Sequence, residues 1–499
     1  MRARLRIVAL LIMLVRVGAS AGETGLLFRC LRETPAYDPR DPMRVIGSFA
    51  AGTELRLEPC SGDAARRLAV YRDPSGKEIR ALCRARDLGL EESAPPPLDR
   101  ETPAPATNAL AAVNARIFDE GLLFEQEADK LARALDLPLE TTTRDLTIYR
   151  SYAPQRIEIF GQRPSMAAIY GNPAKVAEIH LMFLNDGDYF GLERGAGGMP
   201  GARPTAESQR EERVFREALR AQEEVFQKGL ARILGRPADA TMGMGKARER
   251  VSRWDAEGAA LLLSVQDHRY LAVRVWPKAL ADNRGLLPGL TDEKLRARCL
   301  ANVETRPNGD VVIGEIPMIN QGPKGYCVPA TYERVLRYLG MTVDMYSLAL
   351  IGGTRKGGGT RLDLINDAIH GIVQRTGRQV RGGLKLQTSD LKRWIGAGIP
   401  LLWSVFVDPE IEQSSDALTA ERQGVTLEDW KPRLAKYPAP RNLKPDPAAA
   451  HVRLIIGFNE ATQEIAYSDS WGDAARERWM TLAMARAITQ PNGLSAVSW

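Results

Sequence analysis

The segment from Gly309 to Trp499 places its predicted helices before its predicted strands, and this order restricts the folds available to it. Apolar residues recur at helical spacing in four stretches, residues 329–339, 344–351, 362–375 and 389–395. Three β-type runs follow, residues 401–407, 452–458 and 464–467, and the last two are predicted to pair as a hairpin. We therefore expect an α+β domain with a helical half followed by an antiparallel sheet.

Cys327 lies at the predicted start of the first of these helices, after a glycine-containing loop at residues 322–325. A helix N-terminus stabilises a thiolate through its unpaired amides and its partial positive charge. Attack of a thiolate on a carbonyl also requires hydrogen-bond donors for the developing oxyanion. The backbone amide of Cys327 and the side-chain amide of Gln321, six residues upstream, are the candidate donors.

A nucleophilic thiol needs an imidazole base, and the chain contains four histidines. His180 lies in an apolar strand, where we interpret it as a buried core residue. His268 occupies a predicted turn, and His370 ends a helical run, where a cation is mildly favourable. His451 opens the apolar strand of residues 451–458 and is the candidate base.

Asp469 lies on the predicted strand beside His451. Its carboxylate would hold one imidazole nitrogen so that the other faces Cys327. Trp471 is then placed to cover this contact and exclude water. The predicted catalytic set is Cys327 as nucleophile, His451 as base, Asp469 as its orienting acid and Gln321 as oxyanion donor.

These motifs resemble the papain-like cysteine peptidases. The interval from Gln321 to Cys327 is that of the family, and Cys, His and a polar third residue follow in its order. His451 and Asp469 lie 124 and 142 residues after Cys327, close to the roughly 130–150 residues of papain-type chains. Residues 345–360 resemble the narrower branch of bacteriocin-leader (double-glycine) peptidases. The resemblance implies a papain-like fold over residues 309–499 and a peptide or protein substrate.

The sequence departs from these families at two positions and leaves alternatives to a cysteine peptidase open. Val328 stands where the leader-peptidase branch usually has glycine, and Asp469 replaces the asparagine common in papain, although the leader-peptidase branch uses aspartate. One alternative is a non-catalytic peptide-binding or scaffold protein on a degenerate peptidase fold. Another is a cell-wall amidase, although the Asp-Cys-Ser-Gly motif usual in those enzymes is absent. No ATPase or exporter segment accompanies the domain, so a role in bacteriocin export is not implied.

The first 21 residues are typical of an export signal. Three arginines precede the apolar run of residues 7–15, and Ala19-Ser20-Ala21 offers a small-residue cleavage site. Removal of residues 1–21, with four arginines and no acidic residue, lowers the net charge from +6 to +2. This balance favours neither nucleic acid nor an anionic membrane as a partner. We expect an exported protein in the periplasm, the cell envelope or the medium, with no integral membrane segment after cleavage.

Three further regions precede the candidate catalytic domain. Residues 25–92 alternate short β-type runs with turns, which predicts a small β-barrel that resembles bacterial Src-homology-3-like modules. In that family such modules dock onto cell-wall or peptide ligands, so a cell-wall ligand is a possible partner. Residues 93–109 are a proline-rich linker. Residues 110–305 are predicted to be an α+β middle region of unknown role, with helices near 124–137 and 214–234. Its β-type runs are residues 156–159, 177–184, 259–265 and 270–275, and the last two are predicted to pair as a hairpin.

Several other features indicate structure rather than chemistry. Residues 352–360 lack the Gly-Lys-Ser/Thr ending of a phosphate-binding loop and are interpreted as a connector. Glu410 and Glu412 begin a polar insertion up to Ala450. A lid over the cleft is one interpretation of this insertion, and we expect the other, a solvated surface loop. Neither a His-Glu-x-x-His nor a paired Cys-x-x-Cys motif occurs, so no metal or other cofactor is predicted. Export permits disulfides, but the sequence does not determine any pairing among Cys30, Cys60, Cys83 and Cys299.

Overall fold

The computed structural model describes the chain in nineteen stretches, residues 26–29, 34–37, 45–49, 53–59, 66–72, 78–84, 109–118, 123–172, 174–190, 206–243, 248–266, 269–287, 290–322, 325–354, 360, 362–375, 377–438, 440 and 443–499. The chain divides into two compact units, Met1–Thr102 and Pro103–Trp499. Both units contain sheets, and the fold is of mixed α and β type. The predicted export signal and all but the last residue of the predicted linker lie outside the described residues.

The first unit contains an antiparallel sheet of six strands in the order β1-β4-β5-β6-β2-β3. The strands are β1 (Leu26–Arg29), β2 (Thr34–Tyr37), β3 (Val45–Phe49), β4 (Glu54–Pro59), β5 (Arg66–Arg72) and β6 (Glu78–Arg84). Phe49, Leu55, Leu57 and Cys83 are among its buried core residues. The predicted β-rich character is confirmed, whereas closure into a barrel and the likeness to Src-homology-3-like modules remain predictions.

The second unit opens with an eight-stranded antiparallel sheet, the middle sheet, in the order β11-β12-β13-β14-β10-β9-β8-β7. Its strands are β7 (Leu139–Thr142), β8 (Thr147–Tyr152), β9 (Met166–Asn172), β10 (Lys175–Asn185), β11 (Ala238–Met242), β12 (Glu249–Ala256), β13 (Ala259–Gln266) and β14 (Tyr270–Pro277). The hairpin predicted for residues 259–275 is confirmed by the pairing of Gln266 with Tyr270. Strands β7, β8, β9, β11 and β12 were not predicted, and four of them, β7, β8, β11 and β12, mix polar with apolar residues at the two ends of the sheet. The strand predicted at residues 156–159 is wrong, because this segment forms only an isolated bridge between Ile159 and Gln162.

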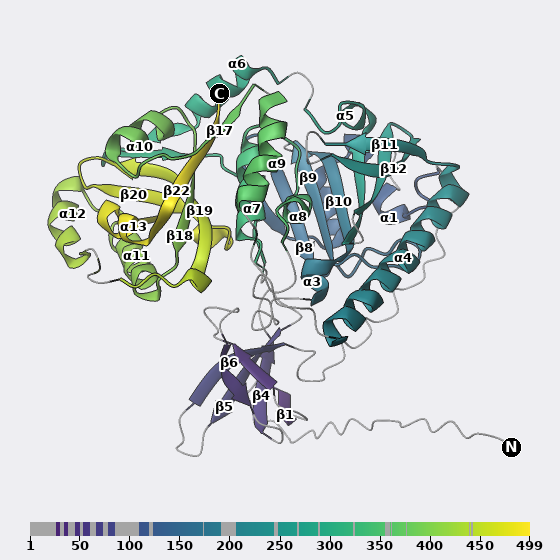
Figure 1. The fold of residues 1–499 in the computed structure, drawn as a ribbon, viewed down its shortest axis with the longest axis horizontal. Helices are drawn as coiled ribbons and strands as arrows, with labels where there is room; N and C mark the ends of the chain where they lie inside the picture. Colours follow the sequence, from purple (N-terminus) through teal and green to yellow (C-terminus); the bar gives the residue numbers. More distant parts are fainter. Residues whose placement is uncertain are drawn as a thin grey trace. The chain divides into compact units, whose positions relative to one another are not determined.

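Some of the helices that precede residue 305 pack into one core with the middle sheet. This part of the chain contains α1 (Ala115–Phe118), α2 (Ala128–Leu135), α3 (Asp186–Phe190), α4 (Ala206–Leu234), α5 (Lys278–Asp282) and α6 (Asp292–Ala301). Leu131 of α2 and Phe226 and Leu230 of α4 pack into one core with the sheet, and Figure 1 shows α4 as the long helix along its side. Both helices predicted in this region are confirmed.

The C-terminal part contains a second eight-stranded sheet together with helices. The helices are α7 (Cys327–Tyr338), α8 (Met345–Ile351), α9 (Leu362–Arg375), α10 (Thr388–Ile395), α11 (Pro409–Glu421), α12 (Leu427–Arg433) and α13 (Leu482–Ile488). The strands are β15 (Val303–Thr305), β16 (Asp310–Ile313), β17 (Gln379–Arg381), β18 (Leu401–Phe406), β19 (Ala450–Asn459), β20 (Glu464–Ser468), β21 (Arg478–Thr481) and β22 (Thr489–Ser498). The main path is β15-β16-β19-β18-β22-β17, and β20 pairs with both β19 and β21. In the described ranges, each helix is too short or too polar to traverse a bilayer.

Helices α7 and α8 lie between the two sheets of the second unit (Figure 1). On one side, Tyr170 and Met182 of the middle sheet form a buried cluster with Tyr326, Ala330 of α7 and Met345 of α8. On the other side, α7 packs against β19 of the C-terminal sheet. The predicted junction between residues 110–305 and 309–499 therefore lies inside one compact unit.

The polar insertion after β18 differs from its expected structure as a solvated loop. Asp408 accepts hydrogen bonds from the first amides of α11 and caps this helix, which begins at Pro409. Ile411 and Leu418 are buried, so one side of α11 joins the core. Glu412 was expected at the surface but is largely buried in ion pairs. The expectation was wrong because only a few apolar residues mark the buried side of this helix.

Candidate active site

Helix α7 begins at Cys327, so this thiol lies where the first amides of the helix have no partner within it. The side chain of Cys327 is partly exposed, whereas almost every later residue of α7 is buried. Pro329 lies in the first turn, where the missing amide of proline costs no hydrogen bond. Cys327 thus presents its sulfur at the end of an otherwise buried helix.

The imidazole of His451 forms a hydrogen bond with Cys327. Burial by itself would raise the pKa of the Cys327 thiol, but the charge of His451, this hydrogen bond and the backbone amide of Val452 lower it below its usual value. Burial also disfavours the charged imidazole, yet Asp469 and Cys327 raise the pKa of His451 to about 10. Both shifts favour the thiolate–imidazolium pair over the neutral thiol and neutral imidazole.

Asp469 holds the other side of the imidazole. Strands β19 and β20 pair antiparallel, His451 lies at the start of β19, and Asp469 directly follows β20. Oδ1 of Asp469 lies 2.6 Å from Nε2 of His451, which leaves Nδ1 as the nitrogen for Cys327. The ring of Trp471 stacks on the imidazole, with 4.9 Å between ring centroids and 30° between ring planes. The structure therefore brings Cys327, His451 and Asp469 together.

A buried ionic network contacts the second carboxylate oxygen of Asp469, Oδ2, and this network was not predicted from the sequence. Nε of Arg453 lies 2.7 Å from Oδ2 of Asp469, and Nη1 of Arg453 lies 2.8 Å from Glu412. Glu412 also contacts Nη1 of Arg478 at 2.8 Å. Burial would raise the pKa of Asp469, but His451 and Arg453 lower it to about 2, so the carboxylate is ionised. The sequence feature that could have indicated this network is a charged residue, Arg453, inside an otherwise apolar strand.

Gln321 lies in the loop before α7, and 9% of its surface is exposed. Its backbone amide donates to the carbonyl of Ser470 at 2.9 Å, which ties the loop to the residue after Asp469. Thr331, one turn into α7, donates its hydroxyl to the carbonyl of Val452 at 3.2 Å. Hydrogen bonds therefore connect the loop, the helix and the hairpin that carry the four predicted residues.

The other histidines have different surroundings. His180 on β10 is 3% exposed, as expected for a core residue. His370 was expected at the end of a helix but lies inside α9, where it is exposed and contacts the side chain of Gln374 at 2.6 Å. His268 lies outside the described residues. Across the described ranges, no group of three or more His, Cys, Asp or Glu side chains is arranged to hold a metal ion.

Cysteines other than Cys327 supply no second candidate nucleophile in the part of the chain that the structure describes. Cys299 on α6 is a free thiol with no exposed surface, and burial raises its pKa. Cys83 is buried in the core of the first unit. Cys30 and Cys60 lie outside the described residues.

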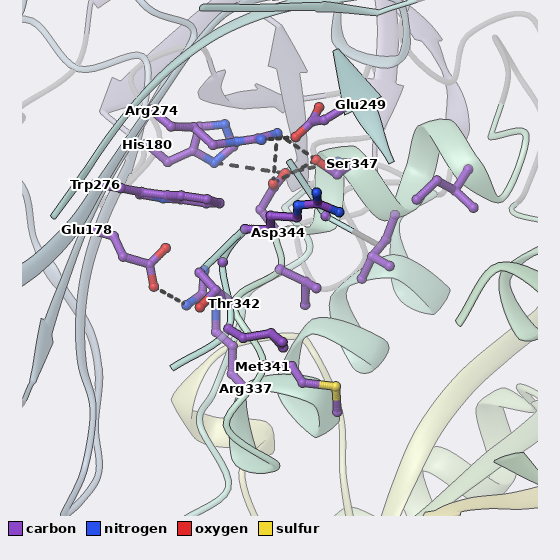
Figure 2. A pocket seen from close by; sticks show the side chains of 17 residues that line it. Glu178, His180, Glu249, Arg274, Trp276, Arg337, Met341, Thr342, Asp344 and Ser347 are labelled. Atoms are coloured by element: carbon purple, nitrogen blue, oxygen red, sulfur yellow. Dashed lines mark hydrogen bonds and ion pairs between the residues drawn. The ribbon is translucent and has the colours of Figure 1, made fainter. Parts of the chain in front are cut away.

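A hollow lies between the middle sheet and α8, and none of the four predicted site residues lines it. Figure 2 shows His180, Arg274 and Trp276 on the sheet side, with Asp344 and Ser347 opposite them. Arg274 contacts Asp344 at 3.4 Å and donates to Ser347 at 2.8 Å. Burial lowers the pKa of His180 to about 4, so its imidazole is neutral at pH 7. These contacts make the hollow an ionic junction between sheet and helix.

Residues 313–490 match the model of the Peptidase_C39 like family. The matched segment contains the helix that begins at Cys327 and the hairpin that carries His451 and Asp469, while the middle sheet lies outside it. No curated protein matches the chain. The family similarity indicates a cysteine peptidase in the C-terminal part and, through it, a peptide substrate.

Proposed function

We propose that residues 309–499 form a papain-like cysteine peptidase domain, which hydrolyses peptide bonds by acyl transfer in an exported protein. The observation that carries this proposal is the contact of Cys327, at the first position of α7, with an imidazole that Asp469 holds at 2.6 Å. The family similarity over residues 313–490 supports the same chemistry. Helices α7, α8 and α9 precede the strands β18, β19 and β20 in the chain, and this order and the position of Gln321 support the papain-like arrangement.

The proposed reaction uses the thiolate of Cys327 to attack the carbonyl carbon of the scissile peptide, whose electron pair moves onto oxygen. The backbone amide of Cys327 and the side-chain amide of Gln321 stabilise this oxyanion. The C–N bond then breaks as protonated His451 donates its Nδ1 proton to the leaving amine. Neutral His451 next takes a proton from water, the water oxygen attacks the thioester, and release of the acid restores the thiolate and the imidazolium.

Two further parts of the proposal concern location and partners. The basic and apolar start of the chain supports export to the periplasm, the cell envelope or the medium. The resemblance of residues 25–92 to bacterial Src-homology-3-like modules supports a cell-wall ligand as a partner besides the peptide substrate. Binding of the isolated wild-type protein to purified cell-wall sacculi, measured by co-sedimentation, tests the second point.

The central experiment compares the full chain with its Cys327→Ala variant against a diverse peptide library, with products identified by mass spectrometry. We expect the substitution to lower cleavage by roughly 10⁴-fold or more, because it removes the nucleophile. Cys299→Ala is the matched control, since this thiol is buried and its loss should leave cleavage intact. Cleavage by Cys327→Ala at the wild-type rate would refute the proposal.

The peptide library, combined with thiol alkylation and a peptidoglycan assay, separates the proposed peptidase from the two alternative functions. A wild-type protein that cleaves no peptide, and whose Cys327 reacts slowly with iodoacetamide at neutral pH, would indicate a binding or scaffold protein. Hydrolysis of amide bonds in peptidoglycan fragments, without cleavage in the peptide library, would indicate a cell-wall amidase. Both results contradict a general peptidase.

A further inference from the structure

The loop of residues 318–322 is bound by the edge strand of the middle sheet. Oγ1 of Thr141 accepts a hydrogen bond from the backbone amide of Met318 at 3.2 Å. The carboxylate of Glu140 accepts one from the backbone amide of Asn320 at 2.9 Å. Both acceptors belong to β7, which is the last strand of that sheet. The edge strand therefore uses its side chains to hold the loop that carries the proposed oxyanion donor.

Tyr152, at the end of β8, holds the same loop through its hydroxyl and its ring. The hydroxyl donates to the backbone carbonyl of Asn320 at 2.5 Å. The ring lies over Gly322, where an added Cβ would approach it to 3.8 Å, and Gly322 has a φ of +66° that favours glycine. The residue before Gln321 is thus fixed at both its amide and its carbonyl, while Ser470 fixes the amide of Gln321 itself.

The side chain of Glu140 is itself fixed to the catalytic helix. Nε of Arg150 lies 2.9 Å from Oε2 of Glu140, and the two side chains are 1% and 8% exposed. Arg150 also contacts Glu333 of α7 at 3.4 Å, and that carboxylate has no exposed surface. A single buried network therefore connects the support of the loop with the helix that begins at Cys327.

The nucleophile side of the site is anchored in the middle sheet as well. Tyr326 directly precedes Cys327, and its hydroxyl donates to Oδ1 of Asn185 at the end of β10 at 3.1 Å. Its ring occupies the space beside Gly187, where an added Cβ would lie only 1.9 Å from the tyrosine hydroxyl oxygen. Both elements that flank the proposed oxyanion position are thus held by the same sheet.

We infer that the middle sheet is part of the catalytic centre, with Tyr152, Glu140 and Thr141 as positioning residues that fix the side-chain amide of Gln321 where the oxyanion develops. This inference rests on the proposed peptidase function. Oxyanion donors act through a geometry that is fixed before the reaction. A loop held only at Ser470 would therefore fix the Gln321 amide less firmly, and that amide would stabilise the oxyanion less. The three positioning residues lie outside the segment matched by the family model, which begins at residue 313.

The test is a double-mutant cycle on the full chain with Tyr152→Phe, Gln321→Ala and the double variant, assayed on a peptide that the wild type cleaves. Gln321→Ala should lower kcat by about 10²–10³-fold, as loss of an oxyanion donor does. Tyr152→Phe should lower kcat about tenfold, with KM within about twofold, because it loosens the donor without removing it. The double variant should be no slower than Gln321→Ala, since the hydroxyl then has no donor to position.

Two measurements separate positioning from a general loss of structure. The rate of Cys327 alkylation by iodoacetamide should stay within about twofold of wild type in all three variants, because the thiolate–imidazolium pair is untouched. Tyr270→Phe is the matched control: it removes a buried hydroxyl of the same sheet that lies 2.6 Å from the carboxylate of Glu249 and, within the described residues, makes no hydrogen bond to the loop or to its supporting network. It should lower stability but leave kcat unchanged. Thr141→Val removes another partner of the loop and should repeat the Tyr152→Phe result.

Three results would overturn the inference while leaving the peptidase proposal intact. They are wild-type kcat in both Tyr152→Phe and Thr141→Val, losses of kcat in Tyr152→Phe and Gln321→Ala that multiply fully in the double variant, and a loss of kcat in Tyr270→Phe equal to that in Tyr152→Phe. Failure of the peptidase proposal itself is distinguishable, because the wild type would then cleave no peptide and Cys327 would react slowly.

Discussion

Nε of Arg453 lies 2.7 Å from Oδ2 of Asp469, and neither side chain has any exposed surface. Asp469 therefore neutralises a buried cation on one side while it orients His451 with its other oxygen. Removal of one partner of a buried ion pair costs about 3–5 kcal/mol, because the remaining charge is left uncompensated. The orienting acid of the site is thus also a structural residue.

Asp469→Asn should separate these two roles. The amide oxygen can still accept a hydrogen bond from His451, but Arg453 loses a counter-charge, and we expect the free energy of unfolding to fall by about 3 kcal/mol. Because the charge of Asp469 raises the pKa of His451, that pKa should also fall. Urea unfolding and the pH dependence of Cys327 alkylation measure the two effects. Adding Arg453→Met removes the uncompensated cation and should recover part of the lost stability, because Glu412 keeps Arg478 as a partner, but it should not restore the His451 pKa. An unchanged stability in Asp469→Asn would contradict the role of this pair.

The pH dependence of Cys327 alkylation should show whether Cys327 and His451 form a thiolate–imidazolium pair. The lowered pKa of Cys327 means that the thiolate persists below the usual range of a thiol and is lost only when the pH falls through that lowered value. Above about pH 10, His451 loses its proton and the thiolate loses its partner. In His451→Ala the pKa of Cys327 should rise, since burial then acts without the imidazole charge. Stopped-flow alkylation with Cys299 as the slow reference thiol measures this, and equal rates for the two thiols at pH 7 would contradict the prediction.

Trp471→Ala should weaken catalysis without abolishing it. The ring stacks on His451 while 43% of its own surface is exposed, so it shields one face of the imidazole from solvent. Aromatic stacking of this kind is worth about 0.5–1.5 kcal/mol, which corresponds to a loss of about 2–10-fold in kcat. Trp471→Phe retains a ring and should keep most of the activity. Steady-state kinetics of both variants provide the check, and a loss as large as that of Cys327→Ala would assign Trp471 a different role.

Glu333→Gln should destabilise the junction between α7 and the middle sheet. The carboxylate has no exposed surface and lies 3.4 Å from Arg150 and 3.0 Å from Arg337. Its neutralisation leaves two buried cations short of a counter-charge, and we expect a loss of about 3–5 kcal/mol in the free energy of unfolding. Glu460→Gln is the control, because its pair with Lys392 is exposed and worth at most about 1 kcal/mol. Similar urea midpoints for the two variants would contradict a junction held by buried charge.

Local sequence patterns were sufficient for the helices and strands that carry the candidate site. The apolar periodicity that ends near Leu339 predicted α7, and the two β-type runs around residues 459–462 predicted the hairpin of β19 and β20. The insertion after β18 was predicted wrongly as a loop, because α11 buries only part of its surface. Arg453 escaped notice as a partner of Asp469, since an ion pair between two strands leaves no periodic signal in either.

The sequence by itself determined which thiol begins a helix, which imidazole opens a strand and which carboxylate follows the next strand, because each depends on near neighbours in the chain. Only the tertiary structure decided that the middle sheet holds the loop of Gln321. Tyr152 and Thr141 contact that loop across separations of 168 and 177 residues. A side chain and a backbone group that meet at such separations are specified by the packing of whole sheets and helices, which no local pattern records.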